Sequence, residues 1–316
     1  MDQIAEVLGS RLPDRWPSKA GRIGSVGFGL ILLLGGSTRE TTAQEQPSPS
    51  NEKREEPSSP RIAATPPENS AARGVLDVDH SQTASLDPFA RARRMIGDCA
   101  NRYRLVEDYS CTFYKRERVD GQLYTPHVMV MKARTSPPSL YFKFIQPNAG
   151  REAIYVHGRN HNKILAHDVG LGRMVAGTMH LDPKGGMAME ENRHPVTEAG
   201  LGSMIETIRE RWTHDLTPAN AQVIFHPQAN VAGRPCTMIE ATHPSPGKDL
   251  LFHKVKLYID KELNLPIRFE AYDWPAKPGA EPLLMEEYTY VNLRVNLGLK
   301  DRDFDPKNSQ YSYGRF

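Results

Sequence analysis

The stretch SLYFKFIQPNAGREAIYVHGRNHNKILAHD, residues 139–168, predicts three short strands separated by two turns. A Pro-Asn-Ala-Gly segment at 147–150 marks the first turn, and a Gly-Arg-Asn segment at 158–160 marks the second. Apolar side chains alternate along the first strand, which is the spacing of residues that share one strand face: Leu140, Phe142 and Phe144. The sequence therefore indicates an antiparallel meander.

Helices and further strands are expected on both sides of this meander. Asp87 followed by Pro88 indicates a helix start, since aspartate caps a first turn and proline suits the first helical position. The apolar stripe of this helix is Phe89, Ala92, Ile96, Cys99 and Tyr103, and that of a second helix is Leu201, Met204, Ile205, Ile208 and Trp212. Strands are expected at 109–119, 122–134, 221–225, 236–242, 251–260, 265–274 and 284–295, whereas 170–195 and 299–316 show no regular period.

These elements predict an α+β domain built on a strongly curved antiparallel β-sheet with two main helices packed on its concave face. Each helix has one apolar side and therefore needs an apolar partner. The space between sheet and helices is either a filled core or a cavity that can take an acyl chain. In the second case the expected apolar lining is Phe142, Phe144, Met204, Ile208, Trp212, Val255, Leu257, Ile259 and Phe269.

The N-terminal part of the chain differs in composition from the rest. Basic residues precede an apolar run at 23–36, and small residues at 41–43 suit cleavage, so 1–43 is expected to be an export signal. The alternatives are an uncleaved membrane anchor and a misplaced start, but the run is shorter than the roughly 20 residues of a membrane-spanning helix. Residues 44–86 are rich in Pro, Ser and Glu and are expected to form a disordered linker before a domain at 87–316. The expected location is the periplasm or cell envelope.

Charge balance and cysteine content argue against several classes of protein. The 316 residues include 40 Lys and Arg against 38 Asp and Glu, a balance that is unlike that of a dedicated nucleic-acid binder. The three cysteines cannot form a disulfide framework, and their spacing is not that of a zinc site. Cys99 and Cys111 come within reach of each other if the chain doubles back near Asp108, so a disulfide and simple packing are both open. Cys236 is expected to be a buried, unpaired residue.

The polar residues show no catalytic signature. The densest set of potential metal ligands is His157, His161, His167 and Asp168. Their strand and turn positions do not imply convergence, so we interpret them as surface or turn residues and expect no metal. Ser203 lies inside a helical pattern and not in the strand-to-helix turn of a hydrolase nucleophile. Carboxylate pairs such as Glu190-Glu191 and Glu286-Glu287 are interpreted as solvated charges, and neither an enzyme nor a cofactor is expected.

Several segments resemble known families. The chain resembles the DUF1571 family through YSCTF at 109–113, KRERV at 115–119, NLGL at 296–299 and DFD at 303–305, together with Asn308. More distantly, it resembles the LolA and LolB lipoprotein-carrier superfamily through its order of elements and through PSLYFKF at 138–144, YVHGRN at 155–160 and the hairpin at 257–269. The resemblance implies an unclosed β-barrel covered by helices, with a cavity for lipid or acyl chains. No binding residue of those carriers transfers to a position in this sequence.

The leading hypothesis is therefore an exported, non-enzymatic protein that holds a lipid or a lipoprotein acyl chain in an apolar cavity between sheet and helices. The alternative is a structural or protein-interaction module of the cell envelope, with a filled core and no ligand. Contact with a membrane surface or with an envelope protein is a further expectation, and nucleic acid is not an expected partner.

Overall fold

The computed structural model of the chain describes residues 87–169 and 177–313. The predicted export signal at 1–43 and the predicted linker at 44–86 lie outside these residues. Within the described residues, no helix combines the length and the apolar composition needed to cross a membrane.

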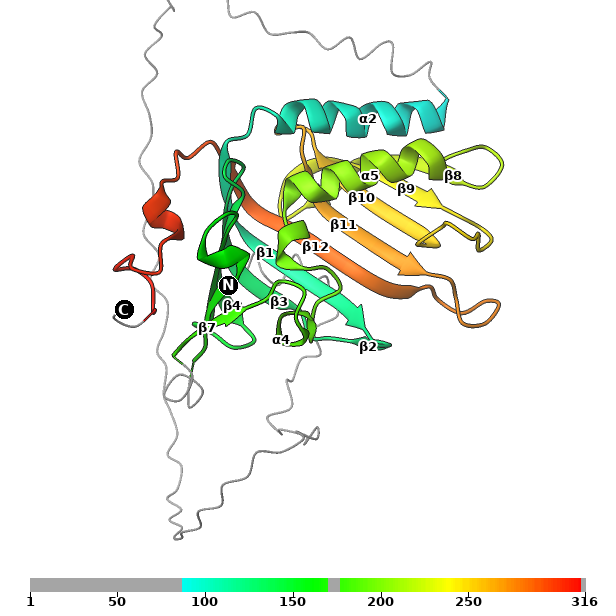
Figure 1. Cartoon of the computed structure of the whole chain (residues 1–316). Helices are drawn as coiled ribbons and strands as arrows, with labels where there is room; N and C mark the ends of the chain where they lie inside the picture. The colour runs from blue at the N-terminus through cyan, green and yellow to red at the C-terminus, as the bar shows by residue number, and fades with distance from the viewer. Residues whose placement is uncertain (1–86, 170–176, 314–316) are drawn as a thin grey trace, which may run out of the picture. The chain divides into compact units, whose positions relative to one another are not determined.

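Twelve antiparallel strands form one curved sheet in the described part of the chain (Figure 1). The strands are β1 (Asp108–Val119), β2 (Gln122–Leu123), β3 (His127–Arg134), β4 (Ser139–Gln146), β5 (Glu152–Val156), β6 (Ile164–His167), β7 (Thr178–Leu181), β8 (Gln222–Val231), β9 (Arg234–Thr242), β10 (Lys254–Asp260), β11 (Pro266–Asp273) and β12 (Leu283–Val295). Their order in the sheet is β7-β6-β5-β4-β3-β1-β12-β11-β10-β9-β8, with β2 paired to β1. The two end strands, β7 and β8, do not pair with each other among these residues, so the sheet is unclosed, as the sequence predicted.

The meander at 139–168 is present as expected. Phe142 on β4 pairs with Met131 on β3 and with Ala153 on β5, and β5 continues the antiparallel pattern to β6. At the centre of the sheet β1 pairs with β12, which brings Phe113 opposite Tyr290. This long-range pairing joins the meander to the C-terminal strands in one surface.

Two helices lie side by side on the concave face of the sheet, α2 (Pro88–Tyr103) and α5 (Leu201–Asp215) (Figure 1). The predicted start of α2 is confirmed, because the Asp87 carboxylate accepts hydrogen bonds from the backbone N–H groups of Phe89 and Ala90 at 2.9 and 3.0 Å. The helices approach closely at Gly202, where a Cβ atom would lie 2.5 Å from the Tyr103 ring. Glycine in a helix interior costs about 1 kcal/mol relative to alanine, and here the missing side chain permits the contact between helices.

Some elements differ from the sequence prediction. The region 170–195, expected to be irregular, contains β7 and the short helix α4 (Gly186–Met189), since β7 gains its hydrogen bonds by pairing with β6. The single strand expected at 122–134 is divided into β2 and β3. Pro126 lies in the break, and proline has no N–H to donate to a strand ladder.

The C-terminal segment 297–313 is ordered, although its sequence has no period. It includes the 3-10 turn η4 (Asp301–Phe304) and places Phe304 and Tyr313 in a buried cluster with Tyr141 of β4 and Leu165 of β6. The rings of Tyr141 and Tyr311 stack with centroids 4.1 Å apart. Since Leu140, Phe142 and Phe144 pack in the main core, this second cluster covers the opposite face of the same strands.

Cys99, Cys111 and Cys236 are free thiols in the structure, and all are buried. A disulfide between Cys99 and Cys111 and simple packing of the two residues were both open from the sequence; the structure has the two thiols unpaired, and the bridge in the oxidised protein stays open. Burial raises the pKa of the Cys99 thiol to about 12 and that of Cys236 to about 12, which leaves both groups as unreactive neutral thiols at pH 7.

Thiol titration distinguishes the two states of these cysteines. We expect the folded protein, without reductant, to react with a disulfide-exchange reagent much more slowly than the same protein in guanidinium chloride, because thiolates are the reactive species and all three sulfurs are buried. Unfolding should release three equivalents of thiol, matching the reduced control. Release of one equivalent, rising to three only after reduction, would establish the bridge.

Candidate functional site

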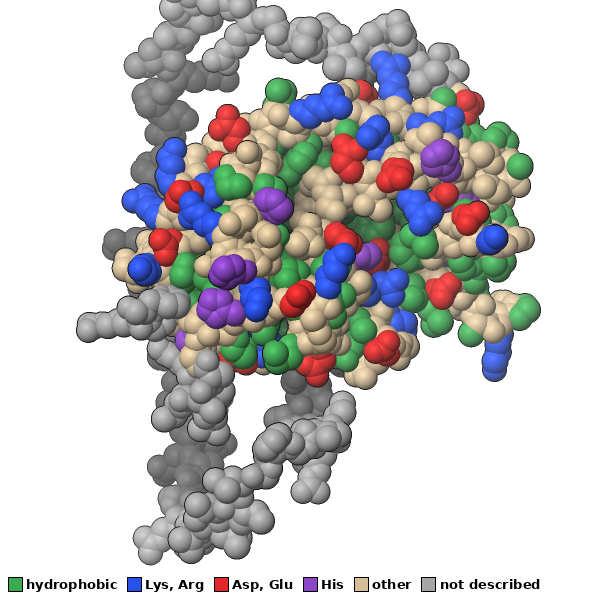
Figure 2. All heavy atoms as spheres, viewed as in Figure 1, with side chains coloured by type: hydrophobic (Ala, Val, Ile, Leu, Met, Phe, Trp, Pro, Cys, Tyr) green, Lys and Arg blue, Asp and Glu red, His purple; other side chains and the backbone are tan. Residues whose placement is uncertain are grey.

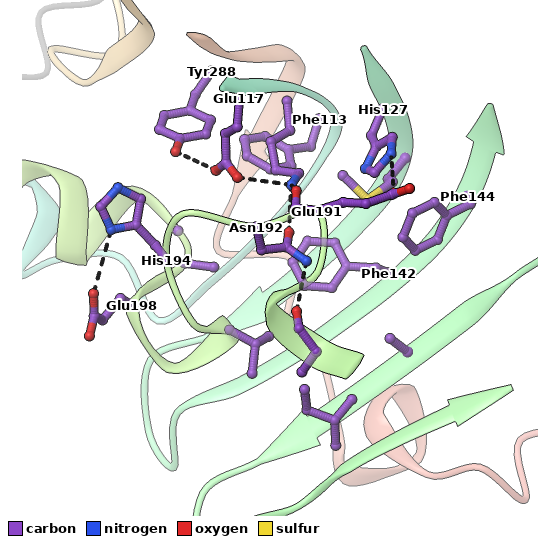
Figure 3. Close-up of a pocket in the computed structure, with 18 of the residues that line it drawn as sticks. Phe113, Glu117, His127, Phe142, Phe144, Glu191, Asn192, His194, Glu198 and Tyr288 are labelled. Atoms are coloured by element: carbon purple, nitrogen blue, oxygen red, sulfur yellow. Dashed lines mark hydrogen bonds and ion pairs between the residues drawn. The ribbon is translucent and has the colours of Figure 1, made fainter. Parts of the chain in front are cut away.

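A cavity of about 550 Å³ opens between the concave face of the sheet and the side of α5 (Figure 3). The strands β1, β3, β4 and β12 form its floor, and residues 186–200, called here the covering segment, lie over it. Much of its wall is apolar and includes Phe113, Met129, Phe142, Phe144, Met204 and Ile208. Small-molecule sites typically have volumes of roughly 300–1,000 Å³ and predominantly apolar walls with a few placed polar groups.

The residues that the sequence suggested as an apolar lining divide into two groups. The cavity wall contains Phe142, Phe144, Met204, Ile208 and Phe269. The solid core contains or contacts Trp212, Val255, Leu257 and Ile259, none of which borders the cavity. The first turns of α5 border the cavity, whereas its last turns pack against the sheet. The same apolar face of the helix therefore lines the cavity at one end and packs in the solid core at the other.

A buried polar cluster at one end of the cavity is centred on Glu117 of β1 (Figure 3). Its carboxylate accepts hydrogen bonds from Tyr288 Oη at 2.5 Å, from Lys115 Nζ at 3.1 Å and from the Arg193 backbone N–H at 2.8 Å. The Glu117 side chain is 3% exposed. Alternation along β1 places Phe113, Lys115 and Glu117 on the strand face that lines the cavity. The ion pair of Lys115 and Glu117 could therefore be inferred from the sequence pattern, although the sequence analysis did not include it.

A second buried carboxylate, Glu286 of β12, holds the same part of the covering segment. It accepts hydrogen bonds from Arg193 Nε at 3.1 Å and from His194 Nε2 at 2.8 Å. The hydrogen bond to Glu286 raises the pKa of His194 above its ordinary value. The interpretation of Glu286 as a solvated charge is therefore wrong, because only 4% of the residue is exposed and pairing with a neighbouring segment buries it.

His127 lies on β3 at the edge of the cavity, with Nε2 3.2 Å from Glu191 Oε2 (Figure 3). Burial, followed by the charge of Lys115, lowers the pKa of His127 to about 4. The imidazole is therefore uncharged at neutral pH, and its contact with Glu191 is not an ion pair.

The residues considered as metal ligands lie in separate environments. Asp168 accepts two hydrogen bonds from Arg151, from Nε and Nη2, each 3.0 Å long. The interpretation of His167 as a surface or turn residue is wrong, because it is buried on β6, with its ring centroid 5.5 Å from that of Tyr313. Across residues 87–169 and 177–313, no group of three or more His, Cys, Asp or Glu side chains is arranged to hold a metal ion. Ser203 lies in α5 and borders the cavity.

The fold and the cavity define a class of protein in which an unclosed antiparallel sheet curves around helices and leaves a largely apolar pocket beneath a covering segment. The chain belongs to the family described as "Protein of unknown function (DUF1571)", which matches residues 106–313. The sequence prediction of this family is confirmed. No curated protein matches the chain.

Three solved structures illustrate what the chain is similar to. The lipoprotein LppX of Mycobacterium tuberculosis is 12% identical, with 65% of this chain and 97% of that chain covered and a TM-score of 0.38. A LolA superfamily protein from Nitrosomonas europaea is 9% identical, with 68% and 97% covered and a TM-score of 0.28. MucB, in the MucA/MucB complex of Pseudomonas aeruginosa, is 14% identical, with 68% of this chain and 60% of that chain covered and a TM-score of 0.38.

Proposed function

We propose that this chain is an exported, non-enzymatic binding protein that holds a lipid or a lipoprotein acyl chain in the cavity between the sheet and α5. The observation that carries the proposal is the volume of about 550 Å³ beside the aromatic wall of Phe113, Phe142 and Phe144. A filled core would have placed side chains in this space. The alternative, an envelope module without a ligand, is therefore the less favoured of the two.

Burial of methylene groups would supply most of the binding energy. Each buried methylene contributes about 0.8 kcal/mol, which corresponds to roughly a fourfold change in the dissociation constant. The polar residues at the end of the cavity are already hydrogen-bonded to one another, as Glu117 is to Lys115 and Tyr288, so they need no ligand to satisfy them.

The acyl-chain length of the ligand provides a direct test of the proposed function. We expect the affinity for uncharged monoacylglycerols, measured by displacement of an uncharged fluorescent probe below the critical micelle concentration, to rise roughly fourfold for each added methylene until the cavity is full. Affinity that does not depend on chain length would contradict burial in an apolar cavity. Native mass spectrometry should recover the bound monoacylglycerol intact, since no hydrolysis is expected.

A bulky side chain in the opening should block binding. Thr207 borders the cavity on α5, whereas Thr213 lies on the same helix, is also exposed and does not border it. We expect Thr207→Trp to weaken monoacylglycerol binding at least tenfold and Thr213→Trp to leave it unchanged, with both variants unfolding at similar denaturant concentrations. Equal affinities for the two variants would place the ligand elsewhere.

A further inference from the structure

The opening of the cavity carries an excess of negative charge that its lining does not neutralise. Glu190, Glu191 and Glu198 all lie on the covering segment and border the cavity. The Glu191 and Glu198 side chains are 38% and 51% exposed, and Glu190 is also exposed. Among the described residues, no Lys or Arg lies within ion-pair distance of these three carboxylates. Glu191 contacts His127, and Glu198 contacts His194.

The cationic residues of the cavity wall, Lys115 and Arg151, are already engaged. Lys115 Nζ donates to Glu117 at 3.1 Å, to Asn192 Oδ1 at 2.5 Å and to the Glu191 carbonyl at 3.0 Å. Arg151 forms a bidentate pair with Asp168. A ligand anion would therefore have to displace a protein partner from either cation, and breaking a partly buried, hydrogen-bonded pair is unfavourable.

The other charged groups beside the cavity do not neutralise the three carboxylates at its opening. Glu286 is paired with Arg193 and His194. Glu152 accepts hydrogen bonds from Tyr141 Oη and from the backbone N–H of Ser312, which belongs to the C-terminal segment. Among the described residues of the cavity wall, Glu190, Glu191 and Glu198 are thus the carboxylates without a Lys or Arg as ion-pair partner, whereas Glu117, Glu152 and Glu286 each have one. Figure 2 shows acidic and basic side chains interspersed over the face in view.

We infer that the cavity selects amphiphiles whose polar end is uncharged or cationic and rejects those with an anionic end, such as a free fatty acid. The inference rests on the proposed function and adds the chemical class of the ligand to it. The apolar chain would lie against Phe142 and Phe144, with the polar end among the carboxylates of the covering segment. Three unit charges at roughly 8 Å in a water-like dielectric weaken binding of an anion about tenfold, and the effect decreases as salt is added.

Ligands that share one alkyl-chain length and differ in their head group test this selection. Monopalmitoylglycerol, hexadecylamine and palmitate are compared at pH 8 and low salt, by displacement of an uncharged fluorescent probe from the full chain. We expect palmitate to bind about tenfold more weakly than monopalmitoylglycerol, and hexadecylamine, a cation at pH 8, to bind about tenfold more tightly than monopalmitoylglycerol. Both differences should shrink in 0.5 M salt, where charges are screened over roughly 4 Å. If all three bind equally, or palmitate binds best, the inference is wrong while the proposed function stands. If none of them displaces the probe, both fail.

Neutralising the carboxylates identifies the groups responsible. The triple variant Glu190→Gln, Glu191→Gln and Glu198→Gln should strengthen palmitate binding several-fold and leave monopalmitoylglycerol binding unchanged. The matched control changes the same net charge at exposed residues that do not border the cavity, namely Glu107→Gln, Glu210→Gln and Glu281→Gln. The control should keep the preference of the unmodified chain. An equal gain in palmitate binding in both variants would mean that overall charge sets the preference, and the inference would be overturned.

Discussion

Leu257→Ala is expected to lower the free energy of unfolding by about 2–5 kcal/mol, the range for truncating a fully buried leucine. Leu257 is 0% exposed on β10, and it pairs with Ile239 on β9 and Phe269 on β11. Because neighbouring strands hold these side chains in place, they cannot move far to fill the space left by the leucine. Urea denaturation followed by circular dichroism would measure the loss, with an unchanged m-value showing that the folded state is retained.

Phe144→Ala is the control for this prediction. Phe144 borders the cavity and is only partly buried, so its removal enlarges an existing space and does not open a new one in close-packed core. We expect a smaller loss of stability than for Leu257→Ala, together with weaker binding of monoacylglycerol. If Phe144→Ala costs as much stability as Leu257→Ala and leaves binding unchanged, the region around Phe144 acts as filled core.

Glu117→Ala is expected to destabilise the fold by about 3–5 kcal/mol, because removal of one member of a buried pair leaves the other without compensation. The variant would leave Lys115, whose side chain is 11% exposed, without its carboxylate. The Arg193 N–H would also lose its acceptor, and the Tyr288 hydroxyl would keep only its 3.4 Å contact with Glu286. The covering segment is attached to the sheet at this point, so we also expect faster proteolysis near residue 193.

An exposed ion pair supplies the comparison for Glu117. Glu206 and Arg209 form a pair on α5 with side chains 54% and 50% exposed, and such pairs contribute about 0–1 kcal/mol. Glu206→Ala should therefore change the unfolding midpoint little. A double variant, Lys115→Met with Glu117→Leu, should recover part of the stability lost in Glu117→Ala, since an apolar pair leaves no unpaired charge. Similar losses for Glu117→Ala and Glu206→Ala would show that the buried cluster does not hold the covering segment.

The two carboxylates Glu117 and Glu286 differ in role from those of the opening. They bind groups of residues 193 and 194 and are nearly inaccessible, with side chains 3% and 6% exposed. Glu190 and Glu198 are exposed and leave their charge at the cavity opening. One set of acidic residues thus positions the covering segment, and the other is available to influence which ligand enters.

The local sequence determined the elements of the fold. Alternation along 139–146 and the Pro and Gly turns define the meander, and the apolar stripes on α2 and α5 define which helix faces are buried. These signals depend only on residues close in the chain, which is why they could be read without coordinates. The family and the curved, unclosed sheet also followed from segments such as YSCTF at 109–113 and from the order of elements.

Only the tertiary structure decided where the space lies and what surrounds it. Phe144 and Val255 have the same apolar character in sequence, yet one borders the cavity and the other contacts the core. Glu286 is buried because Arg193, distant in the chain, lies against it, and Tyr313 is buried because the C-terminal segment returns to β4 and β6. The physical reason is that alternation specifies which face of an element is apolar, whereas cavities and buried charges depend on which faces meet and how completely they fill the volume between them.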